Sequence, residues 1–395
     1  MVQRLAVTVG TIGRFHSFDL AAQLQRRGLL AAVYTGLPRR NFRGVAVDPA
    51  RIRSFPWLQT PIALAQRYRL MPRFLYPTLS WWAHQSLDRH MARTLPDCHV
   101  LVALSSDGLV AGRAAQARNI AWVCDRGSTH IVFQDRLLRE EYARLGLPFA
   151  GVDPRLMEKE QAEYAEADAI TVPSGFVADS FARMGVPRDK VHRLAYGVDL
   201  AAFRPGAARD PGFRVLFAGA LSARKGLPYL LQGFARAAIP GARLLLAGPA
   251  APETEAILAR FPAAGVGRLG ALPRASLAEE MARASVFVLP SVEEGLALVQ
   301  AQAMACGCPV IATPNTGAAD LFDDGREGFI VPLRDVDAIA ERLARLAGDA
   351  ALRTAMGAAA LGRVQALGGW DGYGGAAIDL YASLARARGH AVETG

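Results

Sequence analysis

The sequence predicts an α/β fold built on a parallel sheet, and three observations lead to this expectation. Short apolar runs, of which residues 285–290 are the clearest, are long enough for buried strands and too short for most helices. Segments with apolar residues at helical spacing follow several of these runs, as residues 296–306 do. Polar or glycine-containing turns separate the two kinds of segment. Strands that alternate with helices in this order build parallel sheets.

The first half of the chain alternates in this way except over residues 38–95. The expected strands are 4–9, 30–35, 99–104, 120–124, 169–172 and 191–193. The expected helices are 16–27, 112–118, 135–142, 154–166 and 176–184. In residues 38–95, Pro56, Pro61, Pro72 and Pro77 are expected to produce several short helices rather than one long one.

The second half repeats the alternation. The expected strands are 214–218, 244–247, 285–290, 310–312 and 328–331, and the expected helices are 228–237, 277–284, 296–306, 337–346 and 370–384. Residues 206–212 are rich in glycine, proline and alanine, which is typical of a linker. A chain of 395 residues accommodates two or three domains. We therefore expect one domain over residues 1–205 and a second over residues 206–369.

Composition favours a cytoplasmic globular protein. Hydrophobic residues make up 51% of the chain, but no apolar run reaches the roughly 18 residues that a membrane-spanning helix needs. Met1–Arg4 leads into an expected strand and a glycine turn rather than into the apolar core of a signal peptide. Cys98, Cys124, Cys306 and Cys308 have apolar neighbours and no metal-site spacing, so we expect buried, reduced thiols.

The net charge of +9 is carried almost entirely by arginine, since Lys159, Lys190 and Lys225 are the only lysines. A basic balance favours anionic partners such as nucleotides, phospholipid head groups or nucleic acid. No RNA-recognition, zinc-finger or helix-turn-helix pattern is present, so we expect no nucleic-acid partner.

Residues 51–95 combine aromatic and basic side chains. They include Trp57, Tyr68, Phe74, Tyr76, Trp81 and Trp82, interleaved with Arg51, Arg53, Arg67, Arg69, Arg73, Arg89 and Arg93. This mixture suits a surface that lies on an anionic membrane. It also suits a core of aromatic residues with a solvated arginine face, and the sequence leaves both interpretations open.

The junction between strand 285–290 and helix 296–306 has the chemistry of a ligand site. Gly295 lets the backbone approach a ligand, and the first N–H groups of the helix favour a phosphate. Glu294 and Gln302 are eight residues apart, about 12 Å along a helix, which matches the reach of a nucleotide-sugar from sugar to ribose. The alternative is a helix start whose carboxylates only complement the helix dipole.

The same residues resemble a family. Residues 294–312 read EGLALVQAQAMACGCPVIA, similar to the motif of the retaining GT-B glycosyltransferases of family 4 (glycosyl transferases group 1), in which E-G-F-G is followed by E-A-M-A-x-G-x-P-V-I-A; many of these enzymes are bacterial. The segment 196–205 and the basic loop 219–226 also resemble this family. The likeness is strong over residues 196–333 and weak over residues 38–95.

The resemblance implies two Rossmann-like domains that face each other across a cleft, with a C-terminal helix 370–390 that packs back on the first domain. It also implies residues of the second domain that bind a nucleotide-sugar: Gly219, Arg224, Lys225, Ala271, Leu272, Glu294, Gly295, Leu296, Ala297, Leu298 and Gln302. The planar guanidinium of Arg224 would bind the diphosphate through two N–H groups, and the Lys225 ammonium would bind it as a compact positive charge. Two departures are Gln302, where the family has Glu, and Leu296-Ala297, where it has Phe-Gly.

In the first domain the resemblance points to two loops that follow strands. The loop after strand 4–9 carries Gly13, Arg14 and His16, which would approach the donor phosphates and the acceptor. The loop after strand 120–124 carries Asp125, Arg126 and His130, and the family often places a His or Asp there, near the sugar. Asp125 and His130 are therefore expected catalytic residues, together with Arg224, Lys225 and Glu294. Arg126 is expected to bind substrate.

The implied reaction is transfer of a sugar from a nucleotide diphosphate donor (UDP- or GDP-sugar) to a hydroxyl of a lipid-linked or cell-envelope glycan acceptor, with retention of configuration. Asp335-x-Asp337 lies outside the motif cluster, so we expect no metal and no cofactor. A cytoplasmic location, on the inner face of the membrane through residues 51–95, follows from the same reasoning. A nucleotide-sugar epimerase and a non-catalytic nucleotide-sugar-binding protein remain as alternatives.

Overall fold

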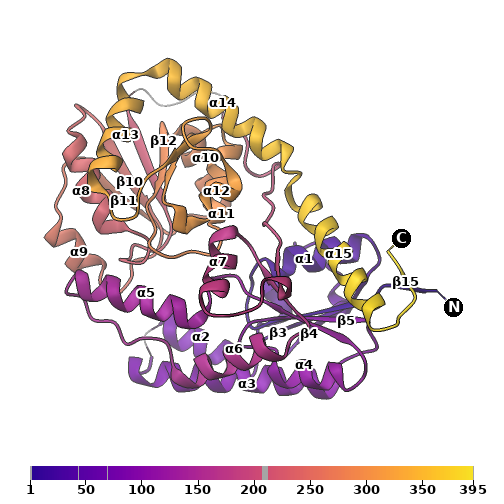
Figure 1. The fold of residues 1–395 in the computed structure, drawn as a ribbon. Helices are drawn as coiled ribbons and strands as arrows, with labels where there is room; N and C mark the ends of the chain where they lie inside the picture. The colour runs from indigo at the N-terminus through magenta and orange to yellow at the C-terminus, as the bar shows by residue number, and fades with distance from the viewer. Residues whose placement is uncertain (1, 43, 69, 207–211, 395) are drawn as a thin grey trace.

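The computed structural model describes residues 2–42, 44–68, 70–206 and 212–394, except the side chains of Arg67 and Arg73. Two parallel sheets with helices on their faces form the lower and upper halves of the molecule in Figure 1. The expected α/β class and the two Rossmann-like halves are thus confirmed. Of the expected linker, residues 207–211 lie outside the described residues.

The lower half is built on seven strands. These are β2 (Val7–Thr11), β3 (Leu30–Thr35), β4 (Ile52–Ser54), β5 (Val100–Leu104), β6 (Ala121–Asp125), β7 (Ala169–Val172) and β8 (Val191–Arg193). The helices are α1 (Ser17–Arg26), α2 (Gln59–Arg67), α3 (Tyr76–Thr94), α4 (Leu109–Gln116), α5 (Ile131–Arg144), α6 (Pro154–Glu166) and α7 (Gly175–Arg183). The strand order is β4-β3-β2-β5-β6-β7-β8, so the sheet reverses its winding direction between β2 and β5.

The upper half is built on six strands. These are β9 (Arg214–Ala218), β10 (Arg243–Ala247), β11 (Val266–Gly270), β12 (Val286–Leu289), β13 (Val310–Ala312) and β14 (Gly328–Ile330). The helices are α8 (Leu227–Ala237), α9 (Thr254–Arg260), α10 (Arg274–Arg283), α11 (Leu298–Ala305), α12 (Ala318–Leu321), α13 (Val336–Gly348) and α14 (Ala350–Ala366). The order β11-β10-β9-β12-β13-β14 reverses between β9 and β12. Parallel sheets bind ligands beyond the strand ends at such reversal points.

The expected elements agree closely with the observed ones, and β3, β7, β8, β9 and β13 match to the residue. Strands β7 and β12 are buried along their whole length, which explains why they appear in the sequence as continuous runs of mostly apolar residues. Gly307 adopts a positive φ just after α11, as a C-terminal cap requires. All four cysteines are buried and none forms a disulfide, as expected.

The expectation of only short helices in residues 38–95 was wrong. Residues 76–94 form the 19-residue helix α3. Pro77 lies in its first turn, where the missing N–H has no helical partner to lose and the fixed φ suits the helix. The proline therefore starts this helix rather than breaking it. Ala83, Leu87 and Met91 give α3 a buried face in the core.

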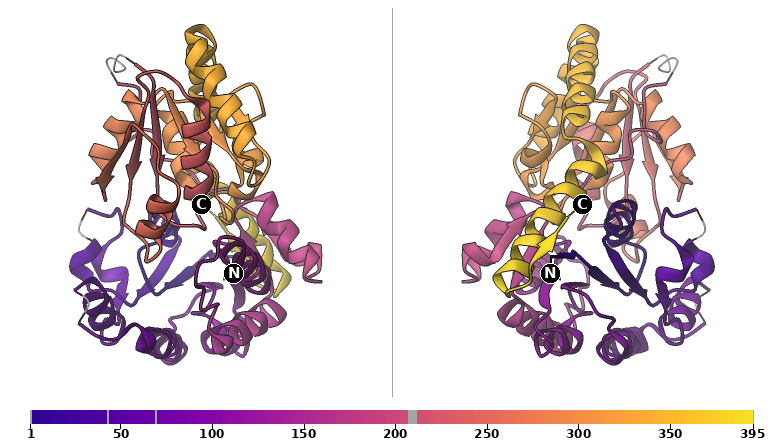
Figure 2. Two further views of the ribbon diagram at one scale, coloured as in Figure 1. Left: turned by 90° about the vertical axis from the view of Figure 1, so that its left-hand side faces the viewer. Right: turned by 90° about the vertical axis from the view of Figure 1, so that its right-hand side faces the viewer.

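Two helices cross between the halves of the molecule. Helix α15 (Gly369–Ala387) runs down beside α1, and its Tyr373 and Tyr381 are buried in the core of the first sheet (Figure 1). In the other direction, the residue that ends α5, Leu145, is buried in the core of the second sheet. The short strands β1 (Gln3–Arg4) and β15 (Val392–Glu393) pair in parallel and bring the two termini together (Figure 2).

Candidate functional site

The loops that follow β6 and β12 meet between the two sheets. Ser128 and Thr129, beyond β6, donate hydrogen bonds to the Glu293 carboxylate, beyond β12. Ser174, in the turn after β7, donates to the Gly295 carbonyl oxygen at 2.6 Å. Each of these loops leaves the carboxyl end of its strand, so the ligand-binding edges of both sheets face each other here.

The loop after β9 brings two cations to this edge. Arg224 Nη1 donates to Glu293 Oε2 at 3.0 Å, and the Lys225 ammonium forms an ion pair with Glu294. Gly226 closes the loop with a positive φ, and a Cβ there would lie 1.9 Å from the Pro290 carbonyl oxygen. Glycine is therefore required at this position, and it lets the loop pack directly against the end of β12.

Glu293 was not predicted from the sequence, because the family motif begins at Glu294 and no other pattern points to Glu293. Its side chain is fully buried and accepts hydrogen bonds from both halves of the molecule. Burial alone would raise the pKa of this carboxyl. The charge of Arg224 and the hydrogen bonds from Ser128, Gln134 and Thr129 outweigh burial and hold the pKa at about 2. Glu293 is therefore ionised in the folded protein, and the charge of Arg224 together with these hydrogen bonds offsets the cost of burying its negative charge.

On the first domain's side the site contains Asp125 and His16. The His16 Nε2 atom lies 2.6 Å from Asp125 Oδ2, and its ring stacks on Tyr196 at 4.2 Å between centroids. The second oxygen, Asp125 Oδ1, accepts a hydrogen bond from Thr171 at 2.9 Å. Burial, and then the charge of Asp125, raises the pKa of Tyr196 well above its usual value, so its hydroxyl is neutral. Asp125 and His16 come from different strand ends, β6 and β2, which only the fold brings together.

A cavity of about 460 Å³ opens beside His16, between α1 and the first residue of α11. Its lining consists of Arg14, Phe15, His16, Phe18, Asp19, Val45, Arg274 and Leu298. Asp19 and Arg274 were not expected from the sequence. Burial raises the pKa of Asp19 within this cavity. The cavity joins both domains and carries charged groups of both signs, which suits a polar ligand.

The structure places Arg126 and His130 away from this cavity. Arg126 is buried, forms an ion pair with Glu160 at 2.8 Å and also donates to the Thr129 carbonyl oxygen. The His130 ring caps α5 by accepting from Val132 N–H, and it packs against Tyr164 and Phe181. Burial, assisted by nearby arginines, lowers the pKa of His130 to about 4.

The remaining expected residues lie along the edge of the second domain, except Gly13, which is in the first domain. Gly295, Leu296 and Ala297 are buried in the turn that leads to Leu298, the first residue of α11. Gln302, on α11, is partly exposed, and Ala271 and Leu272 follow β11. Gly13 is buried in the loop after β2, and Gly219 follows β9 with a φ of 149°. Gly295 closely approaches the first domain: a Cβ at residue 295 would lie 1.8 Å from the Gly127 carbonyl oxygen.

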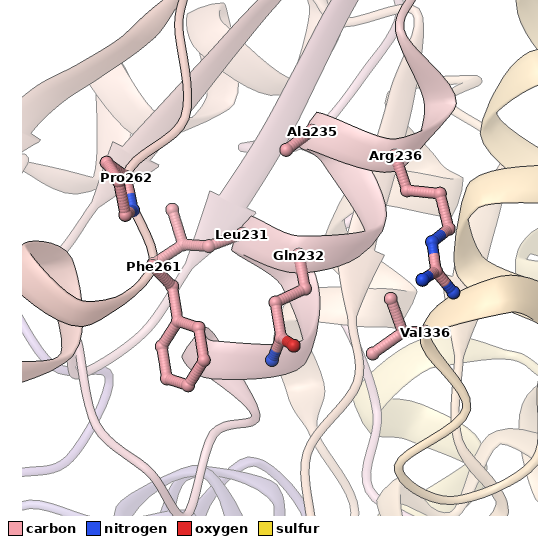
Figure 3. Close-up of a pocket in the computed structure, with 7 residues that line it drawn as sticks. All are labelled: Leu231, Gln232, Ala235, Arg236, Phe261, Pro262 and Val336. Carbon is pink, nitrogen blue, oxygen red and sulfur yellow. The ribbon is translucent and has the colours of Figure 1, made fainter.

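A second hollow, of about 300 Å³, lies on the outer face of α8 (Figure 3). It is lined by Leu231, Gln232, Ala235, Arg236, Phe261, Pro262 and Val336. Its one charged lining residue, Arg236, is already paired with Asp337 of α13. This hollow contains none of the residues that converge at the strand ends, so we do not include it in the site.

Comparison with known families agrees with this geometry. The model described as "Glycosyltransferase Family 4" matches residues 15–202, and the model described as "Glycosyl transferases group 1" matches residues 212–349. The two matches fall on the two Rossmann-like halves and together cover most of the chain. The chain belongs to the family 4 glycosyltransferases.

Curated relatives are similar over part of their length. A D-inositol 3-phosphate glycosyltransferase of Kribbella flavida is 32% identical over 248 residues, which is 55% of this chain and 56% of the relative. A GDP-mannose-dependent phosphatidylinositol monomannoside mannosyltransferase of Mycolicibacterium smegmatis is 31% identical over 52% of this chain and 59% of the relative. The chain thus spans little more than half the length of these relatives.

Solved structures share the whole fold. Sucrose-phosphate synthase from Thermosynechococcus elongatus superposes with a TM-score of 0.73, at 21% identity, over 97% of this chain and 100% of that one. HepE from Anabaena, in complex with UDP and glucose, superposes with a TM-score of 0.70, at 15% identity, over 96% and 100%. At these identities the likeness establishes the GT-B architecture and nothing finer.

Proposed function

We propose that this family 4 glycosyltransferase moves a sugar from a UDP- or GDP-sugar to a hydroxyl of a lipid-linked or cell-envelope glycan precursor, with retention of configuration. The observation that carries the proposal is the convergence of Arg224 and Lys225 with two carboxylates at the reversal point of the second sheet. The names of the relatives, which include inositol phosphate and mannosyl-phosphatidylinositol transferases, support the acceptor class.

The chemistry follows from charge. When the bond between the sugar's anomeric carbon and the diphosphate oxygen breaks, both bonding electrons leave with the diphosphate. Arg224, Lys225 and the free N–H groups at the start of α11 would stabilise that growing negative charge, and preorganised donors of this kind usually supply the largest catalytic effect. The acceptor oxygen then bonds to the anomeric carbon on the face that the diphosphate leaves, and its proton passes to the diphosphate oxygen.

The other residues would hold the donor. Glu294, which is paired with Lys225 in the structure, would accept hydrogen bonds from sugar hydroxyls. Gln302 would bond the ribose hydroxyls, since an amide both donates and accepts. Asp125 and His16 would bind the sugar from the first domain, and the cavity beside His16 would receive the acceptor. No metal or cofactor takes part in the proposed reaction.

A binding experiment tests the donor site. Melting temperatures are measured with UDP, GDP, ADP and their sugars for the wild type, for Lys225→Ala and for the control Lys190→Ala, whose ammonium donates to the Ala165 carbonyl oxygen. A donor at about 100 times its Kd stabilises the folded state by about 2.7 kcal/mol. We expect a shift with one base that disappears in Lys225→Ala alone. If the two lysine variants respond alike, the proposed donor site is wrong.

We also propose that residues 51–95 contact an anionic membrane surface. Trp57, Leu70 and Phe74 expose 73%, 73% and 77% of their surface, and Arg51 and Arg89 are exposed on the same segment. Exposed aromatic and basic side chains together favour the interface of an anionic bilayer. Arg69 and the side chains of Arg67 and Arg73 lie outside the described residues. Among the helices that the structure describes, none is long and apolar enough to span a bilayer.

Vesicle binding tests this contact. We expect the wild type to sediment with phosphatidylglycerol vesicles at low salt, and the double variant Trp57→Ser, Phe74→Ser to stay largely in the supernatant. Leu367→Ser is the control, because Leu367 is also exposed but follows α14. Equal sedimentation of the wild type and the double variant would refute the contact.

A further inference from the structure

The Glu293 carboxylate lies where the two domains meet, and it is bonded on both sides. From the first domain, Oε1 accepts from the Ser128 hydroxyl at 2.6 Å, the Thr129 hydroxyl at 2.8 Å and Thr129 N–H at 3.2 Å. Oε2 accepts from the Gln134 amide at 2.9 Å. From the second domain, Arg224 Nη1 donates to Oε2 at 3.0 Å and to the Glu293 carbonyl oxygen at 3.2 Å.

These five side-chain contacts use both oxygens of a carboxylate that is entirely buried. Removing a hydrogen-bond donor from a buried anion leaves its desolvation cost uncompensated. Conformations in which these donors lie away from the Glu293 carboxylate are therefore high in free energy. Four of the five contacts exist only while the loop after β6 lies against the loop after β12. The fifth holds Arg224, one of the two cations of the proposed diphosphate clamp.

The backbone beside Glu293 also lies very close to the first domain. Gly295 approaches the Gly127 carbonyl oxygen so nearly that a Cβ at residue 295 would lie 1.8 Å from it. Ser174 donates to the Gly295 carbonyl oxygen from a third segment of the first domain. The glycine of the family motif therefore serves the approach of one domain to the other.

We infer that Glu293 is a positioning residue that makes the placement of Arg224 depend on domain contact: the guanidinium is held for the diphosphate only when Ser128, Thr129 and Gln134 hold the carboxylate from the other domain. The inference rests on the proposed function for the role of Arg224. The contact itself does not depend on that role. A purely structural Glu293 would stabilise the interface without transmitting any effect to the loop after β9.

Hydrogen exchange in the ligand-free protein separates these two possibilities. The test variant is Ser128→Ala, Thr129→Val, which removes two hydroxyl donors of the first domain and leaves Glu293 and Arg224 unchanged. We expect faster amide exchange in residues 126–134 and also, across the gap, in residues 219–226. Ser180→Ala is the matched control, because its buried hydroxyl accepts from His130 N–H in the same loop and donates to the Val177 carbonyl oxygen, both within the first domain. Unchanged exchange of residues 219–226 in the test variant would overturn the inference.

Glu293→Gln gives the second test. An amide has one acceptor oxygen, so its NH2 group faces donors either at the Ser128–Thr129 side or at the Gln134–Arg224 side. With UDP-glucose and GDP-mannose as probes, we expect kcat for donor turnover to fall at least about tenfold and KM to change less than about threefold, since the loss is felt mainly as charge develops on the diphosphate. A variant that folds and retains the wild-type kcat would overturn the inference.

The two proposals can fail separately. If the wild type turns over one of these donors and both sets of variants behave as the wild type does, the proposed function stands and the positioning role is wrong. If the wild type turns over neither donor, the proposed choice of donor is wrong. Amide hydrogen exchange of residues 219–226 in the Ser128→Ala, Thr129→Val variant then still decides whether the domain contact affects the loop that carries Arg224. The Gly295→Ala variant adds an independent check, because its Cβ should separate the loops and raise exchange in both segments.

Discussion

Replacing His130 by Asn should remove an acid-sensitive part of the protein's stability without removing activity. His130 is buried, and its ring nitrogen accepts from Val132 N–H, which requires the neutral ring. Burial first, and then the charges of Arg126 and Arg136, lowers its pKa from 6.5 to about 4. Asn is among the best helix N-caps and does not titrate, so the variant can keep the cap without the pH dependence.

The size of the effect follows from this pKa. Below pH 6.5 the unfolded chain takes up a proton that the folded protein refuses until about pH 4, so stability is complete above pH 6.5 and falls as the pH drops through this range. One pKa unit corresponds to about 1.4 kcal/mol, so this residue should cost the folded state about 2.5 kcal/mol between pH 7.5 and pH 4.5. The variant also loses the contacts of the ring with Tyr164 and Phe181. This loss lowers the free energy of unfolding equally at the two pH values, so it cancels when the difference between them is taken.

Urea unfolding of the wild type and of His130→Asn at the two pH values measures the difference. The lowered pKa values of His90, His99 and His192 act alike in both proteins. We expect the wild type to lose about 2.5 kcal/mol more than the variant over this range. Equal losses would refute the reasoning, and a fall of donor turnover by about a hundredfold or more would show that His130 acts as a catalytic acid or base instead.

Three further outcomes are expected. Asp125→Asn should lower kcat at least about tenfold, because it weakens the charge-assisted bond to His16; a near-normal kcat would exclude Asp125 from the reaction. Gln302→Ala should raise the donor Kd about three- to tenfold in calorimetry, since it removes about 1 kcal/mol of hydrogen bonding, and an unchanged Kd would contradict ribose contact. Arg334→Ala should lower the free energy of unfolding by about 3 kcal/mol, because among the described residues it leaves the buried Glu141 carboxylate with the Tyr229 hydroxyl as its remaining side-chain partner. A loss below about 1 kcal/mol in urea unfolding would contradict that account.

Local patterns in the sequence predict the fold well because each strand and helix is encoded by its own residues. The apolar run of β12, the helical spacing of α11 and the turn at Gly307 all read correctly from a short stretch. Helix α3 was missed for a local reason: a proline in the first turn and a proline in the interior look alike in sequence but have opposite effects.

Only some residues of the candidate site could be predicted from the sequence. Arg224, Lys225 and Glu294 could be found from the sequence, since they lie in two short motifs at strand ends. His16 pairs with Asp125 across 109 residues, and Asp19 lines the cavity only because α1 faces α11. Of the two histidines proposed for the site, the fold brings His16 into the cavity and buries His130 among aromatic rings.

The sequence by itself determined the α/β class, the order of most strands and helices, the family and the position of the basic loop after β9. These depend on residues close together in the chain, whose spacing decides whether they form a strand, a helix or a turn. Only the tertiary structure decided that Glu293, and not Glu294, bonds the opposite domain, and that Gly295 is needed for that contact. Both facts depend on the approach of loops more than 100 residues apart, and no local spacing encodes that distance.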